Sequence, residues 1–167
     1  IMGTAKIQKG KKVSVVDKDG KATEYSAENI IIATGARSRE LPNLPQDGVK
    51  VIGYRQALTL PEQPKSMIVV GSGAIGIEFA DFYNTMGTKV TVVELLPNIL
   101  PLEDEDASKH VEKSLKKSGI EIMTNASVES VDTSGNGVKA KVKTAIGEIT
   151  LEADILLSAV GIASNVE

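Results

Sequence analysis

Hydrophobic and polar residues alternate along this chain in a way that predicts short buried strands separated by helices and polar turns. Four runs are almost continuously apolar, which is typical of strands covered on both faces of a sheet. They span Asn29–Thr34, Met67–Val70, Lys89–Val93 and Ile155–Val160. A shorter run at Ile120–Met123 predicts one more strand. Strands of this kind, alternating with helices, predict a parallel sheet.

Two segments between these strands have helical periodicity. The first has an apolar face with members at i, i+4, i+7 and i+11, namely Ile75, Phe79, Phe82 and Met86. Gly87 supplies its stop signal. The second helix is predicted from Glu105 to Lys117, because acidic residues gather at its start and lysines at its end, as the helix dipole favours.

The remaining segments are polar strands and turns. Val13–Val16 and Ala22–Tyr25 predict two strands joined by a turn. Val128–Asp132, Val138–Lys143 and Glu148–Leu151 predict a three-stranded meander. Leu41–Gly48 contains two prolines, at positions 42 and 45, and is predicted to be an extended linker.

One pattern occurs twice. Ala27-Glu28 and Ala33-Thr34-Gly35 correspond, at an offset of 126, to Ala153-Asp154 and Ala159-Val160-Gly161. Each copy follows a polar meander and ends an apolar strand in Ala-x-Gly. Only the second copy has a glycine-rich strand–helix unit before its meander. We therefore expect a parent protein with two similar domains, of which this sequence holds one and the end of the other.

Composition narrows the possible functions. The 167 residues are 41% hydrophobic, which suits a globular core, and the formal charge of −3 has no large block of one sign. Binding to nucleic acid or to an anionic membrane is therefore not indicated. The sequence has no cysteine, which excludes disulfides, Cys-ligated metals and a catalytic thiol within it. His110 is the single histidine and is expected to be an exposed helix residue.

The motif that carries chemistry is Gly71-x-Gly73-x-x-Gly76, placed between a predicted strand and a predicted helix. In such motifs the first glycine permits the tight turn. The second lets the backbone approach a pyrophosphate, and the third allows the helix to pack closely on the strand. Free N–H groups at the start of the helix, near Ala74, then face the phosphates.

Two acids accompany the motif. Glu94 ends the next strand, 18 residues after Gly76, where a carboxylate accepts hydrogen bonds from the adenosine ribose. A carboxylate also repels a 2′-phosphate, and Leu95–Leu100 contains no Arg or Lys to hold one, so NAD is favoured over NADP. Glu78 lies in the first turns of the helix, where it is either an acid favoured by the dipole or a functional group.

The run from Pro64 to Glu94 resembles dihydrolipoamide dehydrogenase, in the wider family of pyridine nucleotide-disulfide oxidoreductases. Ile99-Leu100-Pro101 and Ile30–Arg37 extend the resemblance to nearly the whole chain. It implies an α/β fold with a Rossmann-like NAD(P)-binding domain of the FAD/NAD(P)-binding type, a parallel sheet with an added three-stranded β-meander. On this basis residues 1–48 are predicted to end an FAD-binding domain, and residues 49–167 to form the NAD-binding domain.

The resemblance also implies roles for individual residues. Glu78 matches a family glutamate near the nicotinamide, and Ala74 stands where some relatives have a tyrosine lid. Relatives often continue Gly161 as Gly-Arg-x-Pro-Asn, whereas here Ile162 replaces the arginine and Asn165 is a weaker match. The implied FAD contacts of the parent are Ala33, Thr34 and Gly35. The implied NAD contacts are Gly71, Ser72, Gly73, Ala74, Ile75, Gly76, Glu78, Glu94, Val128 and Gly161.

By this resemblance the parent would be an enzyme that oxidises dihydrolipoamide, with electrons passing through a disulfide and FAD to NAD. It would be a cytoplasmic homodimer within a 2-oxo-acid dehydrogenase complex. The isolated chain would at most bind NAD and is expected to be inactive. The alternatives are another flavin disulfide reductase, such as a mercuric-type or CoA-disulfide reductase, and a non-catalytic NAD-sensing module. A methyltransferase is disfavoured by Gly76 and by the meander.

Overall fold

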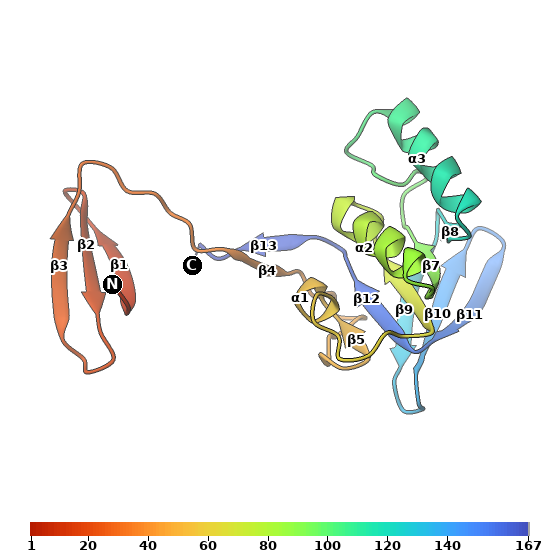
Figure 1. The fold of residues 1–167 in the computed structure, drawn as a ribbon, viewed down its shortest axis with the longest axis horizontal. Coiled ribbons are helices and arrows are strands. Elements are labelled where there is room, and N and C mark those ends of the chain that lie inside the picture. The colour runs from red at the N-terminus through yellow and green to blue at the C-terminus, as the bar shows by residue number, and fades with distance from the viewer. Residues whose placement is uncertain (167) are drawn as a thin grey trace. The chain divides into compact units, whose positions relative to one another are not determined.

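Residues 1–166 are described by a computed structural model and form two compact units, Ile1–Gly35 and Ala36–Asn165. The first unit is a three-stranded antiparallel sheet of β1 (Thr4–Gln8), β2 (Lys12–Val16) and β3 (Ala22–Ser26) (Figure 1). None of its residues is buried. This sheet therefore has strand pairing but no hydrophobic core of its own.

The prediction of a buried strand at Asn29–Thr34 is wrong for this structure. The segment forms no strand, and Ile31 and Ile32 are 90% and 63% exposed. A buried strand forms only when it is hydrogen-bonded to a neighbouring strand and covered by other elements, and no strand of the described residues pairs with this segment. The apolar run therefore has the composition of a buried strand, but among the described residues it has no partner strand.

The second unit is built on a five-stranded sheet in which every neighbouring pair is parallel. In spatial order its strands are β5 (Val51–Ile52), β12 (Ile155–Ser158), β6 (Ser66–Val70), β7 (Lys89–Val93) and β8 (Glu121–Met123). Two helices, α2 (Ala74–Thr85) and α3 (Glu105–Lys117), connect β6 to β7 and β7 to β8. The bounds of β12, β6, β7, β8 and the two helices agree closely with the prediction, whereas β5 was not predicted.

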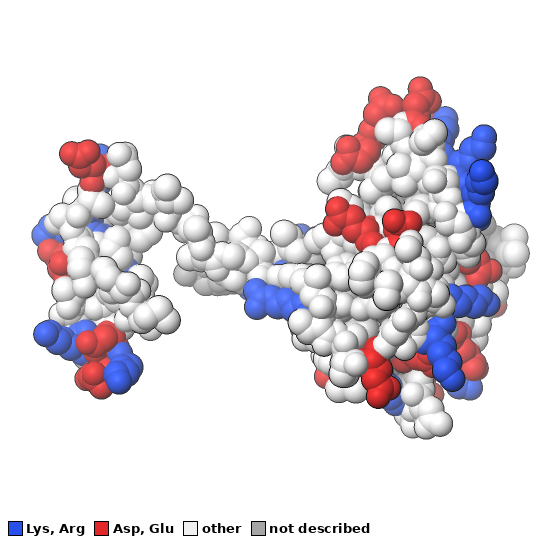
Figure 2. Space-filling view, in the orientation of Figure 1, with Lys and Arg blue, Asp and Glu red and all other residues white. Residues whose placement is uncertain are grey.

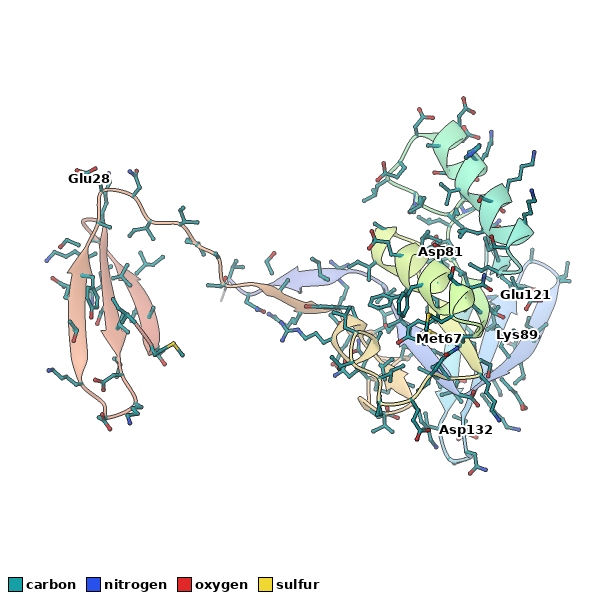
Figure 3. The ribbon with its side chains drawn as sticks, viewed as in Figure 1. Glu28, Met67, Asp81, Lys89, Glu121 and Asp132 are labelled. Atoms are coloured by element: carbon teal, nitrogen blue, oxygen red, sulfur yellow. The ribbon has the colours of Figure 1, made fainter. Side chains whose placement is uncertain are left out.

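Side chains alternate between the two faces of this sheet. Met67 and Leu157 face the core beneath the helices, whereas Ile68 and Leu156 face a second core. A three-stranded antiparallel sheet covers that second face and consists of β9 (Ser127–Asp132), β10 (Val138–Thr144) and β11 (Gly147–Ala153). Figure 3 labels Met67 on β6 and Asp132 at the end of β9. The predicted α/β class, with a parallel sheet and an added meander, is confirmed.

Helix α2 uses a different face from the predicted one. Its buried residues are Gly76, Ile77, Ala80 and Tyr83. Of the predicted face, Phe82 and Met86 are 55% and 56% exposed. A β-carbon on Gly76 would overlap the carbonyl oxygen of Gly71, so the helix lies too close to the glycine turn to admit large side chains there. The buried face therefore combines the small residues Gly76 and Ala80 with the large residues Ile77 and Tyr83.

The segment Leu41–Gly48 is not the extended linker that its prolines predicted. Leu41 and Leu44 form a β-bridge, and Leu44 is only 1% exposed within the second core. Three further short elements were not predicted from the sequence. Strand β4 (Ala36–Ser38) pairs with β13 (Ile162–Ser164), and a one-turn helix α1 spans Tyr54–Ala57. The predicted domain boundary at residue 48 stays a prediction.

Helix α3 has the charge distribution that predicted it. Glu105 and Asp106 lie in its first turn, Lys116 and Lys117 in its last, and acidic and basic side chains separate along it in Figure 2. His110 is exposed on this helix, as expected. None of the helices within residues 1–166 is both long and apolar enough to span a membrane.

Candidate nucleotide-binding site

The glycine turn joins the carboxyl end of β6 to the start of α2. Gly71 has φ +97°, a left-handed conformation that favours glycine, and a β-carbon there would lie 2.6 Å from the carbonyl oxygen of Ala159. By contrast, a β-carbon on Gly73 would meet no atom within 4 Å, so the backbone at this residue faces open space. The turn thus packs tightly against the protein at Gly71, whereas at Gly73 there is space for a ligand to approach the backbone.

The two long helices begin in different ways. Asp104 caps α3, with its side chain accepting a hydrogen bond from the N–H of Asp106 at 3.0 Å. Helix α2 begins at Gly73 with no side-chain cap and no acid in its first turn. The first N–H groups of a helix have no partner within the helix, and together with the dipole they attract anions. The start of α2 is therefore suited to bind a phosphate.

Glu94 follows β7 and is only 7% exposed. Its Oε2 accepts hydrogen bonds from the N–H and the hydroxyl of Ser72, at 2.8 and 2.6 Å, and its Oε1 accepts the N–H of Leu96 at 2.8 Å. Among residues 1–166 it forms no ion pair. Since a buried charge must be compensated, these three donors stabilise the carboxylate in place of a cation.

The glycine turn and Glu94 border one cleft of about 580 Å³ at the carboxyl end of the parallel strands. Ligands of open α/β sheets bind at this end of the strands, and the volume lies in the range usual for small-molecule sites. Most of the lining is apolar, including Leu41, Leu95 and Val128. Its charged members are Glu94 and Glu129, with no lysine or arginine. The charged side chains that an additional phosphate on a ligand's ribose would meet in this lining are therefore both carboxylates.

Comparison with known proteins assigns the family. All 167 residues match the model of the pyridine nucleotide-disulphide oxidoreductases. The chain belongs to this family.

Individual members resemble the chain over most of its length. It is 41% identical over 168 aligned residues to the dihydrolipoyl dehydrogenase of Zymomonas mobilis, covering 100% of this chain and 36% of that protein. Among solved structures, LpdA from Mycobacterium tuberculosis is 33% identical with a TM-score of 0.83, covering 99% of this chain and 37% of that one. The chain thus spans little more than a third of the length of these relatives.

A third relative is an engineered water-forming NADPH oxidase bound to NADPH, which is a mutant of the NADH oxidase from Lactobacillus brevis. It is 25% identical with a TM-score of 0.70, covering 95% of this chain and 36% of that one. Five substitutions distinguish it, including an aspartate changed to alanine and two residues changed to arginine.

In this member of the oxidoreductase family, the structure brings six of the predicted NAD contacts to the lining of the same cleft. These are Gly71, Ser72, Gly73, Glu94, Val128 and Gly161. Gly76 is buried beneath the turn, and Ala74 and Ile75 start the helix. Glu78 is exposed one turn further along and borders a different, smaller depression with Phe79 and Phe82. Ala33, Thr34 and Gly35 are exposed in the first unit.

Sequence reasoning missed one wall of the cleft. Leu41, Asn43 and Leu44 line it, and the Asn43 amide donates to the carbonyl of Val128 at 2.6 Å. The only signal was the pair of prolines around these residues, and it favoured a linker. Within residues 1–166 no group of three or more His, Asp or Glu side chains is arranged to hold a metal ion.

Proposed function

We propose that this chain binds NAD in the cleft between the glycine turn and Glu94. The observation that carries the proposal is the combination of an uncapped helix start, the open backbone at Gly73 and a buried carboxylate on one cleft. The pyrophosphate would lie against the first N–H groups of α2, and Glu94 would accept a hydrogen bond from the adenosine ribose.

Charge supports NAD over NADP. The cleft is lined by two carboxylates and no cation, so a 2′-phosphate would be repelled and left without a partner. The engineered NADPH oxidase agrees with this reasoning. Its exchanged aspartate, alanine, methionine and proline have the same spacing as Glu94, Leu95, Leu96 and Pro101, and two of the four became arginine. In that relative, the variant bound to NADPH has lost the acid and gained two arginines.

The family also implies a flavin, and the described residues do not form a site for it. Ala33–Gly35 lie in a unit whose only regular structure is an antiparallel sheet, with no glycine-rich strand–helix turn. With no cysteine either, this chain's own part in catalysis is to hold and orient the nucleotide. We propose that the longer protein oxidises dihydrolipoamide, as the names of its relatives indicate. We further propose that it acts as a cytoplasmic homodimer in a 2-oxo-acid dehydrogenase complex.

The first experiment is calorimetric titration of the purified chain with NADH and then with NADPH at fixed salt. We expect NADH to bind at least about tenfold more tightly, a difference of about 1.4 kcal/mol. Glu94→Gln should reduce this selectivity. Glu129→Gln is the matched comparison, because it removes the other carboxylate of the cleft, which accepts a hydrogen bond from Ser127. If Glu94 is the carboxylate that contacts the ribose, Glu94→Gln should reduce the selectivity more than Glu129→Gln. Equal affinities for the two nucleotides in the unmodified chain would contradict the role given to Glu94.

A second variant separates binding from folding. Gly73 has φ −65°, which any residue adopts, and open space where a β-carbon would stand. Gly73→Ala should therefore change the free energy of unfolding by less than about 1 kcal/mol but weaken NADH binding by more than about tenfold, because the methyl group occupies the phosphate position. A folded Gly73→Ala chain with unchanged affinity would show that the nucleotide binds elsewhere.

A further inference from the structure

The hydroxyl of Ser72 has an unusual position for a cleft residue. The side chain belongs to the glycine turn, yet Ser72 is 0% exposed. Its Oγ donates to Oε2 of Glu94 at 2.6 Å, a length typical of a charge-assisted O–H···O⁻ hydrogen bond. The carbonyl of Ser72 accepts the N–H of Leu100 at 2.9 Å, which fixes the residue from its other side.

The acceptor capacity of Glu94 is almost filled. A carboxylate has about four lone-pair positions. Ser72 takes two of them on Oε2, through its N–H and its hydroxyl, and Leu96 takes one on Oε1. About one position is left, whereas a ribose presents two neighbouring hydroxyls. The two N–H donors are part of the backbone, so the Ser72 hydroxyl is the only one of the three that a side-chain rotation removes.

We propose that the Ser72 hydroxyl is an internal substitute for a ribose hydroxyl and competes with the nucleotide for Glu94. The proposal rests on the proposed function, since it concerns the adenosine ribose at that site. The same chemical group, an alcohol donating to a carboxylate, occupies the position before and after binding. A nucleotide gains its second hydrogen bond to Glu94 by displacing Ser72. The buried Ser72 hydroxyl then loses its acceptor, and this reduces the net affinity.

The proposal predicts in which direction the nucleotide affinity changes when the Ser72 hydroxyl is removed. Removing the hydroxyl frees a lone pair on Oε2 and leaves no buried donor without a partner. The ribose hydroxyls then contribute more to binding, so nucleotides that have them bind more tightly. A purely structural role predicts the opposite, because loss of a hydrogen bond to Glu94 would loosen the carboxylate and weaken binding.

The test measures the contribution of the ribose hydroxyls directly, with ADP and 2′,3′-dideoxy-ADP as probes. Their ratio of dissociation constants reports how much the two hydroxyls contribute. We expect Ser72→Ala to raise this ratio by about 3- to 10-fold, the effect of one net hydrogen bond, and to tighten NADH binding. Ser72→Gly, which also lacks the hydroxyl, should behave in the same way and serves if the alanine variant does not fold.

Thr91→Val is the matched control. The Thr91 hydroxyl also donates to a carboxylate, that of Glu121 at 3.0 Å, but neither residue lines the cleft. Thr91→Val should leave the ratio unchanged. If Ser72→Ala leaves the ratio unchanged or lowers it while the unmodified chain binds NADH, the competition is refuted and the proposed function stands. If the folded, unmodified chain binds no NADH, the proposed function fails and this inference with it.

Discussion

Residues 1–35 and 127–161 have the same order of elements and very different surroundings. In each, three antiparallel strands are followed by an apolar run that ends in glycine. In the second copy the run becomes β12, which pairs with β5 and β6, and Leu156 and Leu157 are 0% exposed. In the first copy the run pairs with no described strand and Ile31 is 90% exposed.

The three-stranded meanders also differ in burial: the second is buried on one face and the first is not. Along β10, Val138, Ala140 and Val142 are buried against the parallel sheet, and the residues between them are exposed. Along β2 no residue is buried, although Val13 and Val15 alternate with polar residues. The comparison teaches that local pattern selects which conformation a segment is able to adopt, while neighbouring strands determine whether the conformation forms and is buried.

The largest expected difference between the copies is in hydrogen exchange. Amides of Leu156 and Leu157 should exchange only through global unfolding, because they lie in the centre of a covered sheet. Amides of Ile31 and Ile32 should exchange at rates close to those of an unfolded chain. Exchange followed by mass spectrometry of peptides from both segments checks this. Strong protection of residues 29–34 would mean that the first run has found a partner strand.

Truncation of one apolar side chain in each copy gives the next largest effect. Leu157→Ala should reduce the free energy of unfolding by about 2–5 kcal/mol, because it leaves a cavity in the core beneath the helices. Ile31→Ala should change it by less than about 0.5 kcal/mol, because the side chain is already in solvent. Urea denaturation of both variants measures the pair. Equal losses would show that Ile31 is buried in solution.

The smallest expected effect concerns two aspartates that close turns, one in each unit. Asp17 accepts the N–H groups of Asp19 and Lys21. Asp47 accepts those of Val49, Lys50 and Val51 before β5. Burial raises the pKa of Asp47, but these three N–H groups and the charge of Lys50 outweigh it, and the pKa lies below its ordinary value of 3.8.

A lowered pKa in the folded state stabilises the fold above the unfolded pKa, and this contribution is lost as the pH falls through the folded value. Asp47→Asn should therefore flatten the acid limb of the unfolding free energy below about pH 4, with a change below about 1 kcal/mol because the group is partly solvated. Denaturation at several acid pH values, with Asp17→Asn as the comparison, measures this. An unchanged acid limb in Asp47→Asn would exclude Asp47 as its source.

Much of the second unit was predictable because its signals are local. The glycine spacing, the acid after β7 and the dipole-matched charges of α3 each depend on a few neighbouring residues. The buried face of α2 was not predictable from side-chain size, because it includes Gly76, which is buried where the backbone of Gly71 approaches the helix closely. The burial of Leu44 and the exposure of Ile31 depend on partners distant in sequence or absent, which no local pattern reports.

The roles of the site residues divide in a similar way. The residue types at Gly71, Gly73 and Glu94 and their spacing are enough to predict a nucleotide site from the sequence. The hydrogen bonds from Ser72 to Glu94 join residues 22 positions apart, and the presence of a serine at position 72 does not predict them. Asn43 and Leu44 line the cleft because residues 41–44 form a turn, whereas the prolines in this segment predicted an extended linker.

The bare start of α2 has a consequence for the lifetime of the protein. Gly73 caps α2 less well than Ser, Thr, Asn or Asp would, by roughly a few tenths of a kcal/mol, and an anionic ligand bound there supplies the missing hydrogen-bond partners. Thermodynamic linkage then makes the folded population rise with the concentration of that ligand. Proteases act on the unfolded population, so the abundance of such a domain would follow the supply of that anionic ligand.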